Sequence, residues 1–271
     1  MSVFPDLEPG CVWLVGAGPG DPGLLSLLGL HALRQADFVI FDSAIEPELL
    51  GLIPVTAIGE RVDRGHRDDA AAAAARRAID LAMVGWRVIR LKAGDPFSSP
   101  DGIVEAALLA EARVGLRIVP GIRPDLAGLS HAGIPTTHRD INSAFAVAHL
   151  PAQAGEELGP DIIDLALSAP VLLATLDGEL VPGLAQRLIE AGIAPGAAVA
   201  LIARPGTRHQ SVVETTLEAC KTDASTQPAD QRVVFALGPV VPLRHRLGIE
   251  PEDDRRSTRR HPAGFTMSGM G

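Results

Sequence analysis

Short apolar runs alternate with segments of helical period along most of the chain, and this alternation limits the possible folds more than any other feature. The first run, residues 11–15, ends in glycines, and apolar residues then recur with a helical period over residues 24–35. Runs of this length are typical of buried strands whose sheet is covered by helices, so we predict an α/β fold. Further strands are predicted at residues 38–41, 87–91, 116–119, 143–148, 171–174, 198–203 and 232–237, and further helices at residues 68–83, 102–114 and 183–191.

The alternation is interrupted once, close to Pro135. The polar segment that follows, residues 136–140, has the composition of a linker, and strands and helices resume after it. We therefore predict two α/β units with parallel or mixed sheets, over residues 11–137 and 138–247. The remaining residues, 248–271, are rich in arginine and glycine, and we expect a mobile tail there.

Composition and charge exclude several classes of function. The net charge of −9 argues against a broad surface for nucleic acid or for an anionic membrane, and 3% aromatic residues with no tyrosine argue against base stacking. No apolar run reaches the ~18 residues of a membrane helix, and the first residues lack a signal peptide, so we expect a cytoplasmic protein. Cys11 and Cys220 lack a CxxC partner or a histidine at zinc spacing, so no metal site is expected.

A glycine-rich turn, GAGPGDPG at residues 16–23, lies between the first predicted strand and the first predicted helix. Its glycines fit the spacing G-x-G-x-x-G, and Asp42 ends the next strand where a ribose-binding acid would lie. This pattern is compatible with a dinucleotide site or with a purely structural turn. Pro19 and Pro22, however, remove backbone N–H groups that would bind a pyrophosphate. The turn therefore favours a ligand without phosphate groups.

Several segments resemble one known family. The sequences GAGPGDPGLLSL, ADFVIFD, RLKAGDPF, VPGI and AGIPTTHRD occur in that order, followed by LIEAGIAPGAAVALI, GTRHQSVVETTL and ALGPVV. Together they resemble the tetrapyrrole methylases over about residues 11–246, and most of all the branch that acts on uroporphyrinogen III. The resemblance implies a homodimer of two-domain α/β subunits with S-adenosylmethionine in the cleft between the domains. It also implies methyl transfer to pyrrole carbons, giving precorrin-2 for siroheme and corrinoid synthesis.

The resemblance also implies site residues. A sulfonium methyl group is already activated, so neither a metal nor a covalent nucleophile is needed, and the enzyme has to align the two reactants and exclude water. Cofactor-binding positions carry over to Pro19, Ala93, Gly94, Asp95, Ser98, Arg123, Ala174 and Gly206. Asp42 and Glu105 are candidate proton acceptors, although each is equally consistent with a structural acid. Uroporphyrinogen carries eight carboxylates, and the candidate cations for it are Arg61, Arg64, His66 and Arg139, each of which also suits an exposed surface.

Three residues depart from the pattern of that branch. Asp101 stands where an arginine is usual, Arg123 replaces a hydroxyl residue, and Ala174 replaces a methionine. We predict that Arg123 compensates for Asp101, either by binding ligand carboxylates or by pairing with Asp101. Three interpretations remain open: a uroporphyrinogen methylase with a variant site, a relative acting on another tetrapyrrole, a peptide or an RNA, and a binding protein without activity.

Overall fold

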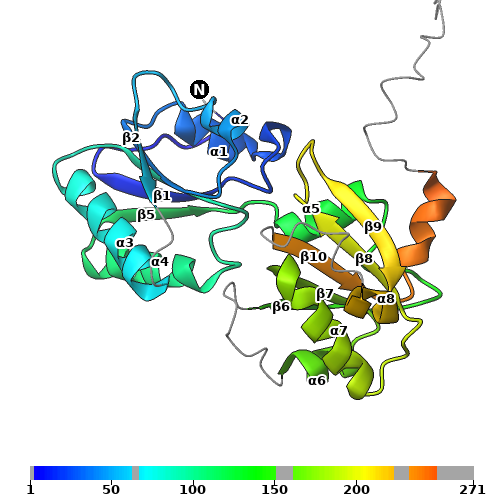
Figure 1. Cartoon of the computed structure of the whole chain (residues 1–271). Coiled ribbons are helices and arrows are strands. Elements are labelled where there is room, and N and C mark those ends of the chain that lie inside the picture. The colour runs from blue at the N-terminus through cyan, green and yellow to red at the C-terminus, as the bar shows by residue number, and fades with distance from the viewer. Residues whose placement is uncertain (1–2, 63–66, 151–160, 223–231, 249–271) are drawn as a thin grey trace, which may run out of the picture.

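The chain folds into two five-stranded sheets, each with helices on both faces (Figure 1). The computed structural model describes residues 3–62, 67–150, 161–222 and 232–248. This architecture confirms the predicted α/β fold. Among the described residues, no helix is both long and apolar enough to cross a membrane.

The first sheet is parallel throughout and has the strand order β3-β2-β4-β1-β5. Successive residues of its central strands enter cores on opposite faces, which is why these strands are continuously apolar. Helices α1 and α2 cover one face, and α3 and α4 cover the other (Figure 1). The bounds are β1 Cys11–Gly16, β2 Phe38–Asp42, β3 Ile58–Val62, β4 Val88–Lys92, β5 Gly115–Val119, η1 Pro22–Leu24, α1 Leu27–Leu33, α2 Pro47–Leu50, α3 Arg67–Met83 and α4 Pro100–Glu111.

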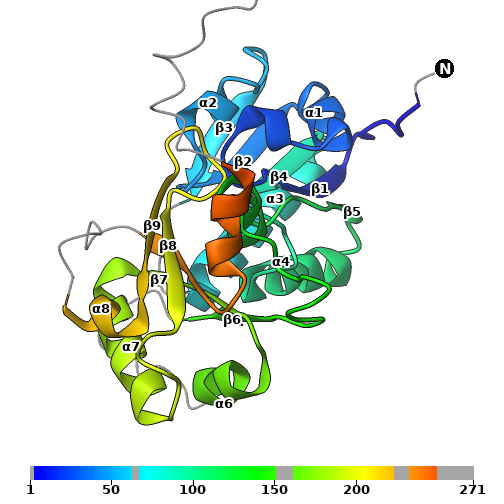
Figure 2. The ribbon, with the colours of Figure 1, turned by 90° about the vertical axis from the view of Figure 1, so that its right-hand side faces the viewer.

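The second sheet is mixed, with the strand order β6-β7-β10-β8-β9, in which only the β6–β7 pair is parallel. Helices α6, α7 and α8 pack on one face, and α5 and the 3₁₀ helix η4 pack on the other. Helix η4 is the orange helix in Figure 2. The bounds are β6 Ala146–His149, β7 Leu172–Asp177, β8 Ala198–Ala203, β9 Ser211–Thr216, β10 Arg232–Leu237, α5 Pro124–His131, α6 Asp161–Ser168, η2 Gly178–Leu180, α7 Val181–Glu190, α8 Leu217–Thr222 and η4 Val241–Leu247.

The predicted strands and helices are present, but several further elements were not predicted from the sequence. The edge strands β3 and β9 are half polar, because an edge strand buries less of its surface than a central one. Helix α1 is shorter than predicted, because Ser26 caps it and the preceding Pro-Gly pair forms η1. Helix α5 precedes the predicted boundary yet packs on the second sheet, where its Leu129 lies in the same core as Leu173 and Ile202. The proposed ranges 11–137 and 138–247 stay a prediction, and the tail from residue 249 lies outside the described residues.

Three glycines bring the loops after β1, β4 and β5 into backbone contact. A Cβ atom added to Gly121 would lie 2.1 Å from the carbonyl oxygen of Gly94, and one added to Gly16 would lie 2.6 Å from Cα of Gly121. The Asp95 carboxylate also accepts a hydrogen bond of 3.0 Å from the Gly121 N–H. The carboxyl-terminal edge of the first sheet is therefore closed by backbone packing that larger residues would prevent.

We expect Gly121→Ala to lower the free energy of unfolding by about 1–3 kcal/mol, because the added methyl group has to displace backbone atoms. Urea denaturation checks this. The matched control is Gly183→Ala in the exposed part of α7, where a Cβ meets nothing within 4 Å. That change should raise stability by about 0.5–1 kcal/mol, since alanine favours a helix more than glycine does. Equal stability of Gly121→Ala and the unmodified protein would contradict the proposed close packing.

Candidate active site between the two sheets

A cavity of about 340 Å³ lies between the two halves of the chain. From the first half it is lined by the glycine-rich turn after β1, by residues 44–46 after β2, and by Ala93, Ser98 and Ser99 after β4. These segments all follow the carboxyl ends of parallel strands, which is where open α/β sheets bind their ligands. From the second half it is lined by the start of α5 and by Thr175, Arg204, Pro205, Thr207 and Arg232.

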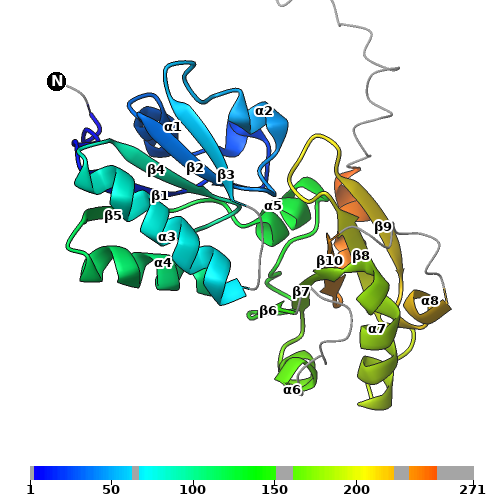
Figure 3. The ribbon, with the colours of Figure 1, turned by 60° about the vertical axis from the view of Figure 1, so that its left-hand side comes forward.

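The β8–β9 hairpin closes one side of this cavity by reaching across to the first half. Figures 2 and 3 show its loop beside α2, and there Arg208 forms an ion pair with Glu48. Behind this contact, Gly206 packs against the glycine-rich turn, so that an added Cβ would lie 2.5 Å from Cβ of Pro19. The cavity is thus bounded by residues that lie almost 190 positions apart in the sequence.

Protein groups already bind the N–H groups of the glycine-rich turn nearest the first sheet. The Ala17 N–H donates to the Lys92 carbonyl at 2.8 Å, and Gly18 and Gly94 exchange two backbone hydrogen bonds of 3.1 and 2.9 Å. Asp21 accepts from the Gly23 N–H at 2.7 Å and caps η1. A turn whose donors are engaged in this way is poorly suited to a pyrophosphate. The contacts therefore favour the interpretation that the ligand has no phosphate groups.

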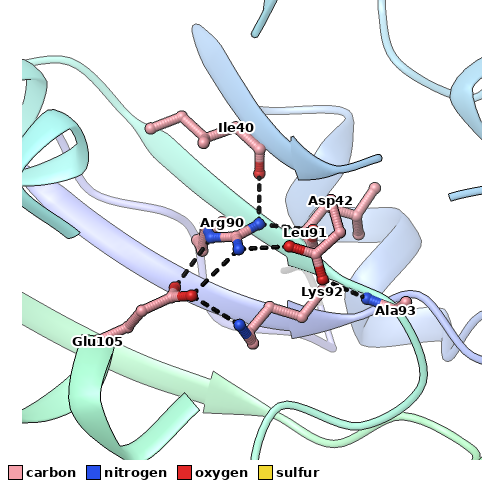
Figure 4. Close-up of polar contacts among 7 residues, drawn as sticks. All are labelled: Ile40, Asp42, Arg90, Leu91, Lys92, Ala93 and Glu105. Atoms are coloured by element: carbon pink, nitrogen blue, oxygen red, sulfur yellow. Dashed lines mark hydrogen bonds and ion pairs between the residues drawn. The ribbon is translucent and has the colours of Figure 1, made fainter. Parts of the chain in front are cut away.

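Four charged residues form a cluster below the first sheet, on the face covered by α4 (Figure 4). Arg90 and Lys92 alternate with apolar residues along β4, so their side chains point to the same face. Arg90 donates to Glu105 of α4 through Nε at 2.9 Å and Nη2 at 3.1 Å, and Lys92 Nζ donates at 2.6 Å. The side chains of Arg90 and Glu105 are 3% and 1% exposed. We call Asp42, Arg90, Lys92 and Glu105 the buried charge cluster.

Asp42 connects the buried charge cluster to the cavity. One carboxylate oxygen accepts from Arg90, and the other accepts from the Ala93 N–H at 3.0 Å (Figure 4). Burial alone would raise the pKa of Asp42, but the charges of Arg90 and Lys92 outweigh it and keep the pKa below its usual value. Burial alone would lower the pKa of Arg90, but Asp42 and Glu105 outweigh it and raise the pKa. Both groups are therefore charged at neutral pH. The Asp42 carboxylate fixes the backbone of Ala93, which lines the cavity.

The structure places the two candidate proton acceptors differently. Glu105 is 1% exposed, both of its oxygens are bound by cations, and it is not among the residues that line the cavity. The Asp42 side chain keeps 21% exposure and is one hydrogen bond from Ala93, which does line the cavity. The role of either carboxylate in proton transfer stays a prediction.

The candidate cofactor residues fall into three groups. Pro19, Ala93, Ser98 and Arg123 line the cavity. Behind that lining, Gly94, Asp95 and Gly206 support it: Gly94 pairs with Gly18, Asp95 binds the Gly121 N–H, and Gly206 packs on Pro19.

Ala174 forms the third group, because its side chain does not face the cavity. It is fully buried in the core between β7 and α7. Successive side chains of a strand point to opposite faces, so the next residue, Thr175, lines the cavity instead.

Arg123 has a different partner from the one predicted. It forms a bidentate ion pair with Asp125, with distances of 3.1 and 2.5 Å, and the hydrogen bond from Arg123 to Asp125 is the main reason that its pKa is raised. The alternative that Arg123 pairs with Asp101 is therefore wrong, and the alternative that it binds ligand carboxylates stays a prediction. Asp101 lies in the first turn of α4, where the positive end of the helix dipole favours an acid.

Of the four candidate substrate cations, the two that the structure describes do not line the cavity. Arg61 is exposed on the edge strand β3, and Arg139 is exposed in the turn before β6; neither is among the lining residues. Arg64 and His66 lie outside the described residues. Within the part of the chain that is described, no cluster of three or more His, Cys, Asp or Glu side chains could hold a metal ion.

Sequence reasoning missed Arg90 and Lys92 in the cluster, and Glu46, Arg204 and Arg232 in the lining. A signal for the first two is present: a cation at alternate positions of a central strand has to find a buried partner. The lining residues carry no such signal, because each follows or begins an ordinary strand or helix.

We expect Glu105→Gln to lower the free energy of unfolding by about 3–5 kcal/mol, because within the buried charge cluster it leaves Asp42 as the one carboxylate for the two buried cations Arg90 and Lys92. Chemical denaturation checks this value. The control is Glu60→Gln, which removes a partner of the surface ion pair with Arg77 and should cost less than about 1 kcal/mol. Similar losses for the two variants would contradict the role assigned to the buried charge cluster.

The lowered pKa of Asp42 predicts sensitivity to acid. Because its pKa is below the ordinary value of 3.8, the stabilisation is complete above that pH and is lost as the pH falls through the lowered pKa. We expect Asp42→Asn to reduce the slope of unfolding free energy against pH below about 4. Part of the dependence of unfolding free energy on pH remains in both proteins, because the hydrogen bond with Arg87 also lowers the pKa of Asp37. Identical slopes would contradict this prediction.

Comparison with known proteins agrees with this geometry. A uroporphyrinogen-III C-methyltransferase of Sinorhizobium sp is 39% identical over 249 residues, which cover 90% of this chain and 88% of that protein. Siroheme synthase 2 of Aeromonas hydrophila is 34% identical over 257 residues, but the chain spans only 53% of its length. A solved structure, uroporphyrin-III C-methyl transferase from Thermus thermophilus complexed with S-adenyl homocysteine, superposes with a TM-score of 0.72 at 28% identity, covering 86% of this chain and 99% of that one.

A solved cobalt precorrin-4 methyltransferase, at 22% identity and a TM-score of 0.76, shares the fold over 86% of this chain. The family described as Tetrapyrrole (Corrin/Porphyrin) Methylases matches residues 11–221. This range includes the first sheet, the second sheet except β10, and every described segment that lines the cavity except Arg232. The family match, together with the 39% identical relative, shows that this chain belongs to the tetrapyrrole methylase family.

Proposed function

We propose that this protein is an S-adenosylmethionine-dependent C-methyltransferase that converts uroporphyrinogen III to precorrin-2. The observation that carries the proposal is the cavity between the glycine-rich turn and the second sheet, in a chain 39% identical to a uroporphyrinogen-III C-methyltransferase along almost its whole length. The Thermus thermophilus structure of the same fold is complexed with S-adenyl homocysteine, which supports the choice of cofactor.

The residues of the cavity fit S-adenosylmethionine in size and in chemistry. A volume of about 340 Å³ lies within the range of small-molecule sites, roughly 300–1,000 Å³. Ile45, Leu49 and Pro124 supply apolar surface, while Glu46 and the arginines supply groups for an ammonium and a carboxylate. Glycine at position 206 leaves space that a Cβ would fill, against Pro19.

The bound cofactor would supply a methyl group that is already activated on a sulfonium sulfur. The protein then has to hold the substrate carbon in line with that group and to keep water away. The loop of Ala93 is suited to this task, because Asp42 binds its N–H and Gly94 is bonded to Gly18 on the opposite segment. We assign Glu105 a positioning role through Arg90 and Asp42 a positioning role through the Ala93 N–H, since both oxygens of each carboxylate are already bound.

All three departures from the family pattern are compatible with this activity. Asp101 is explained by its place at the start of α4, and the charge of Arg123 is matched by Asp125. The replacement of methionine by Ala174 removes no side chain from the cavity wall, because position 174 faces the opposite core. The homodimer and the cytoplasmic location expected from the sequence remain part of the proposal.

Calorimetry with S-adenosylhomocysteine, followed by an assay of precorrin-2 formation from uroporphyrinogen III, tests the proposal. We expect binding and turnover. Binding without turnover would favour another substrate, and the absence of both would favour a protein without methylase activity.

A matched pair of variants shows whether the cofactor binds in the cavity described. Gly206→Ala should push Pro19 toward the cavity and weaken S-adenosylhomocysteine binding about tenfold, which corresponds to roughly 1.4 kcal/mol. Gly183→Ala, far from the cavity lining, should leave the affinity unchanged. Equal affinities for the two variants would place the cofactor elsewhere.

A further inference from the structure

We propose that Arg204 and Arg232 form a carboxylate-binding subsite on the second-sheet wall of the cavity. This inference rests on the proposed function and deepens it, because it assigns residues to the recognition of a ligand's carboxylate. Both arginines line the cavity, one directly after β8 and the other at the start of β10. Neither belongs to the cations that the sequence suggested for the substrate.

The alternation of β10 directs Arg232 toward the cavity. Val233 and Phe235 point to the core beneath α7, whereas Val234 points to the core beneath α5. Arg232 has the same parity as Val234 and therefore lies on the α5 side. In the antiparallel register it stands opposite Asp177 of β7, two residues from Thr175, which also lines the cavity.

The guanidinium of Arg232 is held in place before any ligand binds. Its Nη2 donates to the Thr175 carbonyl oxygen at 3.1 Å, and its Nε lies 3.8 Å from the Asp177 carboxylate. The side chain is still 34% exposed. A planar guanidinium carries five N–H donors in a fixed arrangement, and orienting it in advance reduces the entropy lost when it binds a carboxylate.

Arg204 has a backbone conformation that is uncommon for a residue with a side chain. Its φ angle is +47°, and its carbonyl oxygen accepts from the N–H and the hydroxyl of Thr207, which fix the turn. A left-handed residue other than glycine costs free energy and is often found at binding sites. In the described part of the chain its exposed guanidinium makes no hydrogen bond or ion pair.

The distribution of charge around the cavity favours an anion on this wall. Asp125, which is 3% exposed, already balances Arg123 by a bidentate pair. The remaining acid of the lining, Glu46, comes from the first half, whereas Arg204 and Arg232 come from the second. Asp177, 3.8 Å from Arg232 Nε, offsets that charge only in part, and no described acid pairs with Arg204. The ligand group that complements the second-sheet wall is therefore a carboxylate, either that of the methionine end of the cofactor or one of those on the tetrapyrrole.

Arg232→Gln and Arg204→Gln distinguish the two sources. Affinities are measured by calorimetry for S-adenosylhomocysteine and for 5′-methylthioadenosine, which lacks the amino-acid end, and KM is measured for uroporphyrinogen III. If the cofactor supplies the carboxylate, S-adenosylhomocysteine binding weakens about ten- to a hundredfold and 5′-methylthioadenosine binding does not change. If the tetrapyrrole supplies it, cofactor affinity is unchanged and KM rises by a similar factor.

Controls separate this subsite from general damage to the fold. Arg77→Gln, on α3 and outside the cavity lining, should change neither affinity nor KM. Arg232→Lys should recover only part of the loss, since an ammonium does not make the bidentate contact. Arg204 lies outside the strands, so its variant keeps the test valid even where Arg232→Gln fails to fold.

Two results would overturn the proposal. A wild-type protein that binds S-adenosylhomocysteine or turns over uroporphyrinogen, with both glutamine variants equal to it, refutes the subsite and leaves the proposed function intact. A wild-type protein that neither binds nor turns over either molecule refutes the proposed function and the subsite together.

Discussion

Arg90 lies beneath the first sheet, where an unpaired guanidinium would destabilise the fold by several kcal/mol, and Glu105 supplies the opposite charge. The ion pairs of Arg90 and Lys92 with Glu105 join β4 to α4. Through Asp42, Arg90 also reaches β2 and the N–H of Ala93, whose residue lines the cavity. The same contacts that compensate the buried charges thus set the position of the loop on which a ligand would rest.

The two walls of the cavity are made in different ways. The first-half wall is formed by small residues of the loops after β1 and β4, among them Gly18, Gly20 and Ala93, together with side chains after β2. Behind it, Gly16, Gly94 and Gly121 approach so closely that side chains there would collide. The second-half wall consists of side chains that begin or follow strands, with Arg232 fixed by its neighbours on β7. The closely packed first-half wall fixes the shape of the cavity, whereas the oriented charges of the second-half wall select a ligand that carries a charged group. The hairpin that joins them through Arg208 and Glu48 brings the two kinds of recognition together.

The residues that depart from the family pattern show why a substituted position has to be judged from its surroundings. Arg123 and Asp125 are two positions apart and compensate each other, which the motif alone does not reveal. Ala174 faces a core and Thr175 faces the cavity, so one residue of strand register decides whether a substitution touches a ligand.

The sequence by itself determined the α/β class, the central strands and the glycine-rich turn, because local apolar patterns and glycine and proline positions depend on few long-range contacts. It also indicated Pro19, Ala93, Ser98 and Arg123, which the tertiary structure brings to one cavity.

Only the tertiary structure decided which side chains share that cavity and which acids are bound internally. Glu105 is separated from Arg90 by 15 positions and Arg232 from Thr175 by 57, and no local pattern encodes such pairings. They arise because strand alternation and helix packing place distant side chains on a common face, where burial then makes opposite charges pair.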